Sequence, residues 1–194
     1  MKGKFILLLD NYDSFTFILR DYFLQLGVNC TVVKNDAASV AELAAMEPAA
    51  LVISPGPGRP QEAGILMEAL AYFCDKIPVL GICLGHQAIG CYFGATLVHA
   101  QRPMHGKTAV VHHHGHPLFD AVPDPFEVMR YHSLIVDQTE ASPLDVIAAT
   151  PALEIMAIAH RELPVWGVQF HPESVGTPYG LQMLHNWLRH TLTL

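Results

Sequence analysis

Apolar runs alternate with amphipathic segments along the first half of the chain, and this pattern predicts strands alternating with helices. Residues 5–9 are apolar without a break, and residues 15–26 then carry apolar side chains at helical spacing. The same order follows three more times. Further strands are predicted at residues 30–33, 51–53 and 79–82, with helices at residues 39–46, 62–73 and 84–93.

Turn and capping residues separate these elements. Ser39 and Glu42 have the spacing of a capping box, so a helix is expected to begin directly after Ser39. Residues 54–60 are rich in Pro and Gly and can form neither helix nor strand. Strands that are apolar throughout and alternate with helices indicate a parallel sheet buried on both faces. The predicted fold class is therefore α/β.

The pattern changes after residue 95. Short β-like pieces are separated by Pro, Gly and His, which predicts an antiparallel or mixed arrangement for this part. These pieces lie at residues 108–111, 126–129 and 145–148, two further strands at 155–159 and 165–169, and a final amphipathic helix at 179–191. No linker or repeat divides the 194 residues, so we expect one domain over residues 1–194.

Charge and hydropathy exclude several classes of protein. The chain carries 11 Lys and Arg against 18 Asp and Glu, a net charge of −7, and no basic run could follow a nucleic acid backbone. The early apolar run at residues 5–9 is far shorter than the ~20 residues that span a bilayer, and too short for the core of a signal peptide. We therefore expect a cytoplasmic protein that binds neither nucleic acid nor membranes.

Cys83 is the strongest candidate for a nucleophile. The four cysteines lack CxxC spacing and are expected to be free thiols. Cys83 lies between a predicted strand and a predicted helix, with Gly81 and Gly85 beside it, which is the setting of a nucleophile elbow. The start of a helix favours a thiolate, and the N–H of Leu84 can point toward an oxyanion. A buried structural cysteine is the alternative, and the cysteines without this setting are Cys30, Cys74 and Cys91.

His171 and Glu173 are candidates for a base and its orienting group. They follow the predicted strand at residues 165–169, so they are expected at the same edge of the sheet as Cys83. Residues i and i+2 share a face in an extended segment, and Pro172 favours extended geometry at His171. Glu173 could then accept from one imidazole nitrogen while the other faces the thiol. A surface pair is the alternative for such a motif on its own.

Two further polar segments are candidates for a site. The glycine-rich segment at residues 54–60 could bring backbone N–H groups to an oxyanion, but it lacks the Lys and Ser/Thr of a phosphate loop, and a rigid turn is equally plausible. Residues 11–16 are polar and aromatic at the end of a strand, where α/β proteins place sites and contacts. The helix stripe after them is expected in the core and consists of Phe15, Leu19, Tyr22 and Phe23.

A cluster of histidines suggests a metal site at first sight. Neighbouring residues in a strand point to opposite faces, and no cysteine or carboxylate cluster joins these histidines. A solvated strand end is the favoured interpretation, and no metal is expected. The histidines are His112, His113, His114 and His116.

Several motifs together resemble the class I, or triad, glutamine amidotransferases. More narrowly, they are similar to the glutaminase subunits of anthranilate synthase and of aminodeoxychorismate synthase. The motifs occur in that family's order, at residues 10–16, 54–58, 81–87, 105–107, 130–134 and 169–174. One departure is Ala95, where many relatives have the second glycine of a pair.

The resemblance implies a flavodoxin-like three-layer α/β sandwich, a small antiparallel or mixed sheet and a reaction without a cofactor. Cys83 would attack the side-chain amide of L-glutamine, His171 would act as base and then protonate ammonia, and Glu173 would orient His171. The family's oxyanion donors map to the backbone N–H groups of Gly56 and Leu84. Its glutamine-binding positions map to Gly56, Pro57, Gly58, Gln87, Ser133 and Leu134.

The resemblance also implies a protein partner, a synthase chain that uses the ammonia to aminate chorismate. The product could be anthranilate, for tryptophan, or aminodeoxychorismate, for folate, or both, because that chemistry belongs to the partner. Two alternatives stay open. A stand-alone γ-glutamyl hydrolase would use the same triad without a partner, and a non-enzymatic regulatory module would be expected to lose one of the triad residues.

Overall fold

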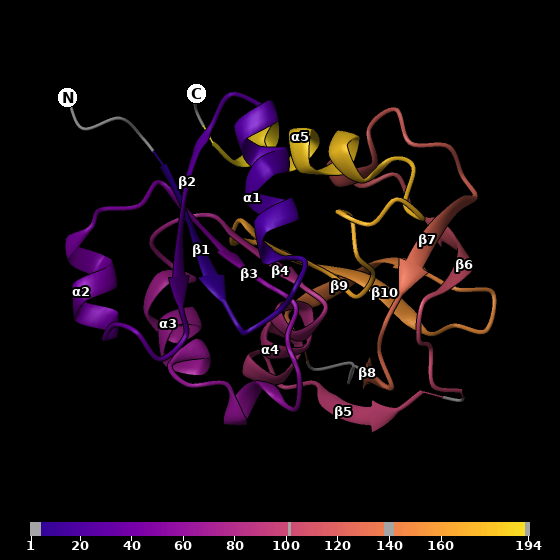
Figure 1. The fold of residues 1–194 in the computed structure, drawn as a ribbon. Coiled ribbons are helices and arrows are strands. Elements are labelled where there is room, and N and C mark those ends of the chain that lie inside the picture. Colours follow the sequence, from indigo (N-terminus) through magenta and orange to yellow (C-terminus); the bar gives the residue numbers. More distant parts are fainter. Residues whose placement is uncertain (1–4, 101, 138–141, 193–194) are drawn as a thin grey trace.

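A nine-stranded sheet forms the middle of the molecule in the computed structural model, which describes residues 5–100, 102–137 and 142–192 (Figure 1). The parallel strands are β1 (Phe5–Asp10), β2 (Asn29–Lys34), β3 (Ala50–Ile53), β4 (Val79–Ile82) and β11 (Val165–Val168). The strands antiparallel to their neighbours are β6 (Lys107–His113), β7 (Phe126–Arg130), β9 (Leu144–Ala149) and β10 (Ile155–His160). The strand order is β2-β1-β3-β4-β11-β10-β9-β6-β7.

Helices cover both faces of the parallel strands and complete three layers. One face carries α1 (Thr16–Gln25) and α5 (Gly180–Thr191), and the other carries α2 (Val40–Ala45), α3 (Leu66–Phe73) and α4 (Leu84–Tyr92). Side chains alternate between the two cores along β1, since Ile6 and Leu8 pack on the first face and Leu7 and Leu9 on the second. Because both faces of β1 are buried, all of these side chains are apolar, and the strand appears in the sequence as an unbroken apolar run.

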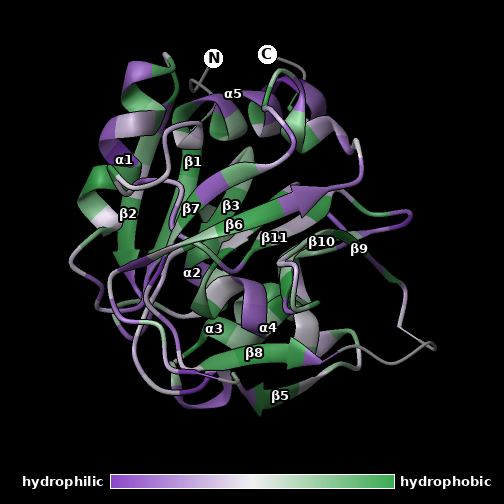
Figure 2. Ribbon diagram, turned by 90° about the vertical axis from the view of Figure 1, so that its right-hand side faces the viewer, coloured by the Kyte–Doolittle hydropathy of each residue, from purple (hydrophilic) through white to green (hydrophobic). Residues whose placement is uncertain are grey.

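The hydropathy of the elements follows their position. Figure 2 shows mostly hydrophobic residues along the central strands, whereas hydrophobic and hydrophilic residues alternate along α5 on the outside. The described helices have at most 12 residues, and none of them is long and apolar enough to cross a membrane.

A second, two-stranded sheet pairs β5 (Thr96–His99) with β8 (Leu134–Asp137) in antiparallel fashion beside α4. Two short 3-10 helices, η1 (Pro60–Glu62) and η2 (Pro117–Phe119), complete the described elements. The sequence predicted neither β5 nor β8. Both strands are largely solvent-accessible, with only Val136 buried, so they lack the alternation that marks a strand.

The α/β prediction with its mostly parallel main sheet and small antiparallel sheet is confirmed, with one correction to an element. The capping box has formed, with Glu42 N–H donating to Ser39 Oγ at 3.3 Å and Ser39 N–H donating to Glu42 Oε2 at 2.8 Å. The helix expected at residues 62–73 begins only at Leu66, because Gly64 has a φ of +55°, outside the helical region. The small sheet is the β5–β8 pair, and the antiparallel strands β6, β7, β9 and β10 extend the main sheet.

The loops and the two ends of the described chain lie at opposite edges of the parallel sheet, where the strands end and where they begin. The carboxyl ends of β1, β3, β4 and β11 meet at one edge, where the loops that follow them gather. The start of β1 and the end of α5 lie at the opposite edge, at the top of Figure 1. Cys83, His171 and Glu173 lie in the loops of the first edge, whereas Gln87 lies in α4, and Ser133 and Leu134 lie where β7 leads into β8.

Candidate active site

Cys83 stands on a strained turn between β4 and α4. Its backbone has a φ of +52° and a ψ of −96°, a region that residues other than glycine rarely adopt. Cys83 N–H donates to Val168 O at 2.8 Å, which ties the turn to β11. Glycine is required beside it, since a Cβ on Gly85 would lie 2.5 Å from Ile53 O. The packing around the turn therefore holds the thiol up at the end of the sheet.

The start of α4 is open. No described side chain caps this helix, so its first N–H groups remain available beside Cys83. The positive end of the helix dipole lies at the same place and favours a negative charge there. Leu84 is the residue directly after the cysteine, as the elbow interpretation requires.

His171 and Glu173 form a buried pair. His171 Nδ1 lies 2.6 Å from Glu173 Oε1, and each residue is only 2% exposed. An extended segment was expected to bring them together, but they lie in a tight turn in which Ser174 N–H donates to His171 O at 3.3 Å. His171 N–H also donates to Met129 O at 3.0 Å, which fixes the start of the turn.

The pair favours the charged form of His171. Burial lowers the pKa of His171, but the interactions with Cys83 and Glu173 more than offset burial and raise the pKa to about 10. Glu173 occupies Nδ1, so Nε2 is the nitrogen left for the thiol. In this resting geometry Nε2 has no hydrogen-bond partner within the described residues, and such contacts often close only when substrate binds.

Two aromatic rings pack against His171. The ring centroids of Phe15 and Tyr131 lie 5.6 Å and 4.9 Å from that of the imidazole, and 5.4 Å from each other. Phe15 was expected in the core beside Leu19 and Phe23. Those two are fully buried, but Phe15 is half-buried at the wall of the site. The difference arises because Phe15 precedes α1 and faces the loop edge.

The glycine-rich segment after β3 is held by the loop after β1. Asn11 N–H donates to Ser54 Oγ at 2.8 Å, and Asn11 Nδ2 donates to Ser54 O at 3.0 Å. Asn35 Nδ2 in turn donates to Asn11 Oδ1 at 3.0 Å. A Cβ on Gly56 would lie 2.5 Å from Asn11 Cβ and 2.8 Å from Leu84 Cδ2, so this backbone rests directly against the start of α4.

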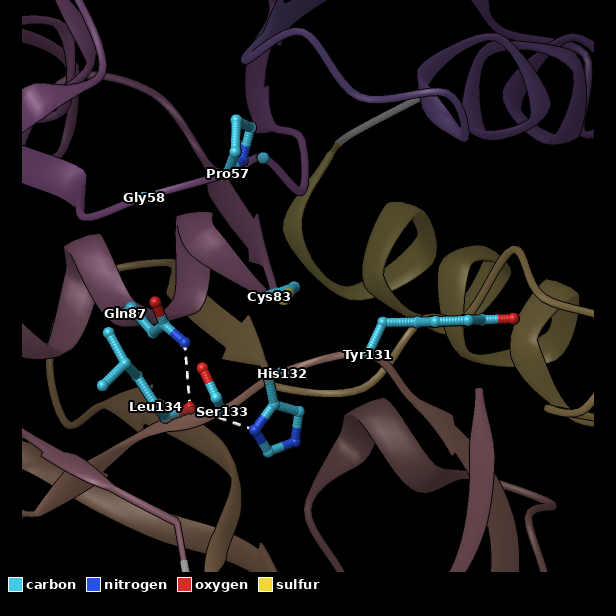
Figure 3. Close-up of a pocket in the computed structure, with 9 residues that line it drawn as sticks. Pro57, Gly58, Cys83, Gln87, Tyr131, His132, Ser133 and Leu134 are labelled. Atoms are coloured by element: carbon cyan, nitrogen blue, oxygen red, sulfur yellow. Dashed lines mark hydrogen bonds between the residues drawn. The ribbon is translucent and has the colours of Figure 1, made fainter. Parts of the chain in front are cut away.

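A small pocket of about 150 Å³ opens beside Cys83 (Figure 3). The structure places all the glutamine-binding candidates named from the sequence on its walls. Tyr131 and His132 also line it, although in the sequence they stand out only as part of a motif. The lining residues are Gly56, Pro57, Gly58, Cys83, Gln87, Tyr131, His132, Ser133 and Leu134.

Among the described residues, the lining of the pocket contains no Asp, Glu, Lys or Arg. Burial and the neighbouring Arg130 lower the pKa of His132 to about 3, so its imidazole is neutral. Gln87 Nε2 donates to Leu134 O at 3.1 Å, which joins α4 to the start of β8. Walls without a charged side chain suit a ligand with a neutral amide group better than one with a phosphate or carboxylate in the same place.

The other thiols and the histidine cluster lie elsewhere. Burial raises the pKa of Cys30 to about 12 and also raises the pKa of Cys74 and Cys91, so these thiols are poor nucleophiles at neutral pH. His112 Nδ1 lies 3.2 Å from Asp124 Oδ1, and the His113 ring stacks on Phe119. Within the described residues, no group of three or more His, Cys, Asp or Glu could hold a metal ion.

Comparison with known proteins identifies the family of this chain. The family described as Glutamine amidotransferase class-I matches residues 7–191. "Aminodeoxychorismate/anthranilate synthase component 2" of Bacillus subtilis is 48% identical over 184 residues, with 94% of this chain and 95% of that protein covered. "Aminodeoxychorismate synthase component 2" of Escherichia coli is 46% identical over 184 residues, covering 94% and 98%. The crystal structure of a putative GMP synthase subunit from Thermoplasma acidophilum superposes with a TM-score of 0.85 at 26% identity, covering 97% and 94%.

Proposed function

Since the chain belongs to the class I glutamine amidotransferases, we propose that Cys83, His171 and Glu173 form the triad with which it hydrolyses L-glutamine. The observation that carries this proposal is the meeting of two independent features. A strained strand-to-helix turn presents Cys83 at the pocket. In the buried His171–Glu173 pair, Glu173 lies 2.6 Å from Nδ1 of His171, Nε2 stays without a hydrogen-bond partner among the described residues, and Cys83 is close enough to help raise the pKa of His171.

The proposed reaction has two steps. The Cys83 sulfur attacks the side-chain amide carbon of glutamine, and the carbon–nitrogen bond breaks as His171 delivers a proton to the departing ammonia. Water then attacks the thioester, gives up a proton to His171 and releases glutamate with the thiol restored. The N–H groups of Gly56 and Leu84 would hold the oxyanion in both steps. The residues that would bind the rest of glutamine are Gly56, Pro57, Gly58, Gln87, Ser133 and Leu134.

The proposal extends to a partner. The Bacillus subtilis relative is named as component 2 of a synthase, and this chain covers 95% of it. We therefore propose that ammonia passes from this chain to a separate synthase that aminates chorismate. The aromatic product, anthranilate or aminodeoxychorismate, would be decided by the synthase, since chorismate would bind there.

Reconstitution tests this function. Mixing the chain with each candidate synthase, chorismate and glutamine is expected to yield an aminated aromatic product that mass spectrometry identifies as anthranilate or aminodeoxychorismate. Omitting the chain should leave only ammonia-dependent synthesis. Full glutamine hydrolysis by the isolated chain, with no glutamine-dependent amination by any synthase, would instead identify a stand-alone hydrolase.

The partner is also expected to raise kcat/KM for glutamine. Uncoupled hydrolysis would lose ammonia to solvent, so gating by the synthase is favoured. The sensing element is expected in the loop after β1, where Tyr12 is 54% exposed and Phe15 contacts His171. Tyr12→Ala should reduce the activation by about tenfold, the effect of losing one aromatic anchor, and should reduce the basal rate less.

Steady-state glutaminase assays with and without synthase and chorismate check this expectation. Tyr72→Ala, at an exposed tyrosine of α3, is the matched control and should retain full activation. Identical kcat/KM values with and without every synthase would remove the case for gating.

A further inference from the structure

The side chain of Gln169 contacts Cys83 from the interior of the protein. Gln169 follows β11, two residues before His171, and is fully buried. Its Nε2 lies 3.6 Å from Cys83 Sγ, within hydrogen-bond distance for sulfur. The proposed reaction gives this side chain no role. A buried amide in contact with a reacting atom is an unexplained feature of the site.

The neighbours of Gln169 decide which end of its amide faces the sulfur. Gln87 Nε2 lies 3.1 Å from Leu134 O and 3.2 Å from Gln169 Oε1. A backbone carbonyl can only accept, so Gln87 must direct its NH₂ group to this place, with one hydrogen for each acceptor. The Gln169 atom that accepts must then be its oxygen. Its NH₂ group therefore faces Cys83, as a donor.

The Leu134 carbonyl is itself fixed by a buried series of hydrogen bonds. Arg130 binds Glu154 Oε2 at 2.6 Å and donates from Nε to His132 Nε2 at 3.0 Å. Since Nε2 of His132 accepts, Nδ1 carries the proton and donates to Leu134 O at 3.0 Å. Figure 3 shows the bonds from His132 and Gln87 converging on this oxygen. In each hydrogen bond of the series, only one of the two partners can be the donor.

We propose that Gln169 is a catalytic residue that donates a hydrogen bond to the Cys83 thiolate and stabilises it before attack on glutamine. The proposal rests on the proposed function, because it requires Cys83 to be the nucleophile. An N–H donor binds a thiolate more strongly than a thiol, so it favours the reactive form. The N–H donors at the start of α4 then remain free for the oxyanion. The thiolate sulfur and the oxyanion are each stabilised by a different donor.

Few other groups near Cys83 titrate around neutral pH. Burial lowers the pKa of His86 to about 4 and, together with Arg130, lowers the pKa of His132 to about 3, so both stay neutral. His171, backed by Glu173, interacts with Cys83, and the phenol of Tyr131 lines the same pocket. A measured titration of Cys83 therefore belongs to the Cys83–His171 pair.

The variant Gln169→Glu tests the N–H donor, because it removes the NH₂ group and keeps the size of the side chain. A carboxylate can still accept from Gln87, so the pocket is preserved, but the group that faces Cys83 becomes an acceptor with a negative charge. The midpoint of the pH dependence of alkylation by iodoacetamide should rise by at least about one unit, the loss of one charge-assisted hydrogen bond. Glutamine turnover at neutral pH should fall about tenfold in kcat, with KM nearly unchanged.

Two further variants complete the experiment. Gln169→Met, which has neither donor nor charge, should raise the alkylation midpoint less than Gln169→Glu, whereas a role in packing alone would not produce this order. Gln25→Met, at the exposed end of α1, is the matched control and should leave the midpoint unchanged. Cys83→Ser supplies the background labelling of the other thiols.

The outcomes separate the two proposals. Alkylation of Cys83 with an unchanged midpoint in Gln169→Glu would overturn the role of Gln169 and leave the triad standing. Labelling of a different cysteine in the wild-type chain would overturn the triad itself. If both Gln169 variants fail to fold, the side-chain amide signals of Gln169 in the wild-type NMR spectrum decide. They should shift as Cys83 ionises, and signals indifferent to Cys83 would overturn the role.

Discussion

Cys83→Ser is expected to abolish glutamine hydrolysis, with kcat at least about 10⁴-fold lower, because a serine hydroxyl does not ionise at this site as a thiol does. Glutamine-dependent amination by the synthase should disappear with it. Amination supplied with free ammonia should continue, since that step uses none of the residues of the proposed triad.

The same variant is expected to fold normally. Serine and cysteine are nearly isosteric, and the backbone at residue 83 is held by the hydrogen bond to Val168 O and not by the sulfur. Thermal melting followed by circular dichroism should show little change in Tm. Cys91→Ser, in the helix α4 that follows Cys83, is the matched control and should keep its activity. Substantial glutaminase activity in Cys83→Ser would refute the assignment, as would a glutamine-like affinity label found on another cysteine.

Removal of the His171 imidazole is expected to lower kcat for glutamine by about 10³-fold or more, because residues of a triad act as a unit. Asparagine is a better replacement than alanine. Alanine would leave the carboxylate of Glu173 buried without its partner, which typically costs about 3–5 kcal/mol of stability. The amide of His171→Asn can still donate to Glu173, so the loss of activity would report the missing base and not unfolding.

The comparison with the other histidines makes this test specific. Replacing His112, His113 and His114 together by alanine should change glutaminase activity little, because these residues lie along and beyond β6, away from the pocket. Metal analysis of the purified chain should find no stoichiometric ion. An inactive triple variant with normal folding would show that the histidine cluster had been dismissed wrongly.

Local patterns predicted most of the parallel sheet and the position of the elbow. β1, β3 and β4 are apolar on both sides, and glycines beside Cys83 mark a sharp turn directly. The pocket walls could be named only through the resemblance to a family, since nothing local in Ser133 or Leu134 points to a ligand. β5 and β8 were missed because they bury little, and the turn at His171 was missed because Pro172 suits both geometries.

Gln169 shows why the remainder could not be predicted. A lone glutamine after a strand resembles any polar residue at the start of a loop. Its partners Gln87 and Cys83 are 82 and 86 positions away, and the donor direction depends on a third residue, Leu134. Such long-range relations follow from topology, which brings the ends of β4 and β11 together, and no sequence window contains them.

The edge of the sheet opposite the pocket is a place where additions to the chain would not disturb the site. The start of β1 and the end of α5 both lie there, remote from the loops that follow β1, β3 and β4 (Figure 1). An affinity tag, a surface tether or a whole domain spliced onto either terminus would therefore leave the mouth of the pocket clear. Gene fusion and immobilisation are accordingly compatible with this scaffold, and insertions into the loops at the carboxyl edge are not.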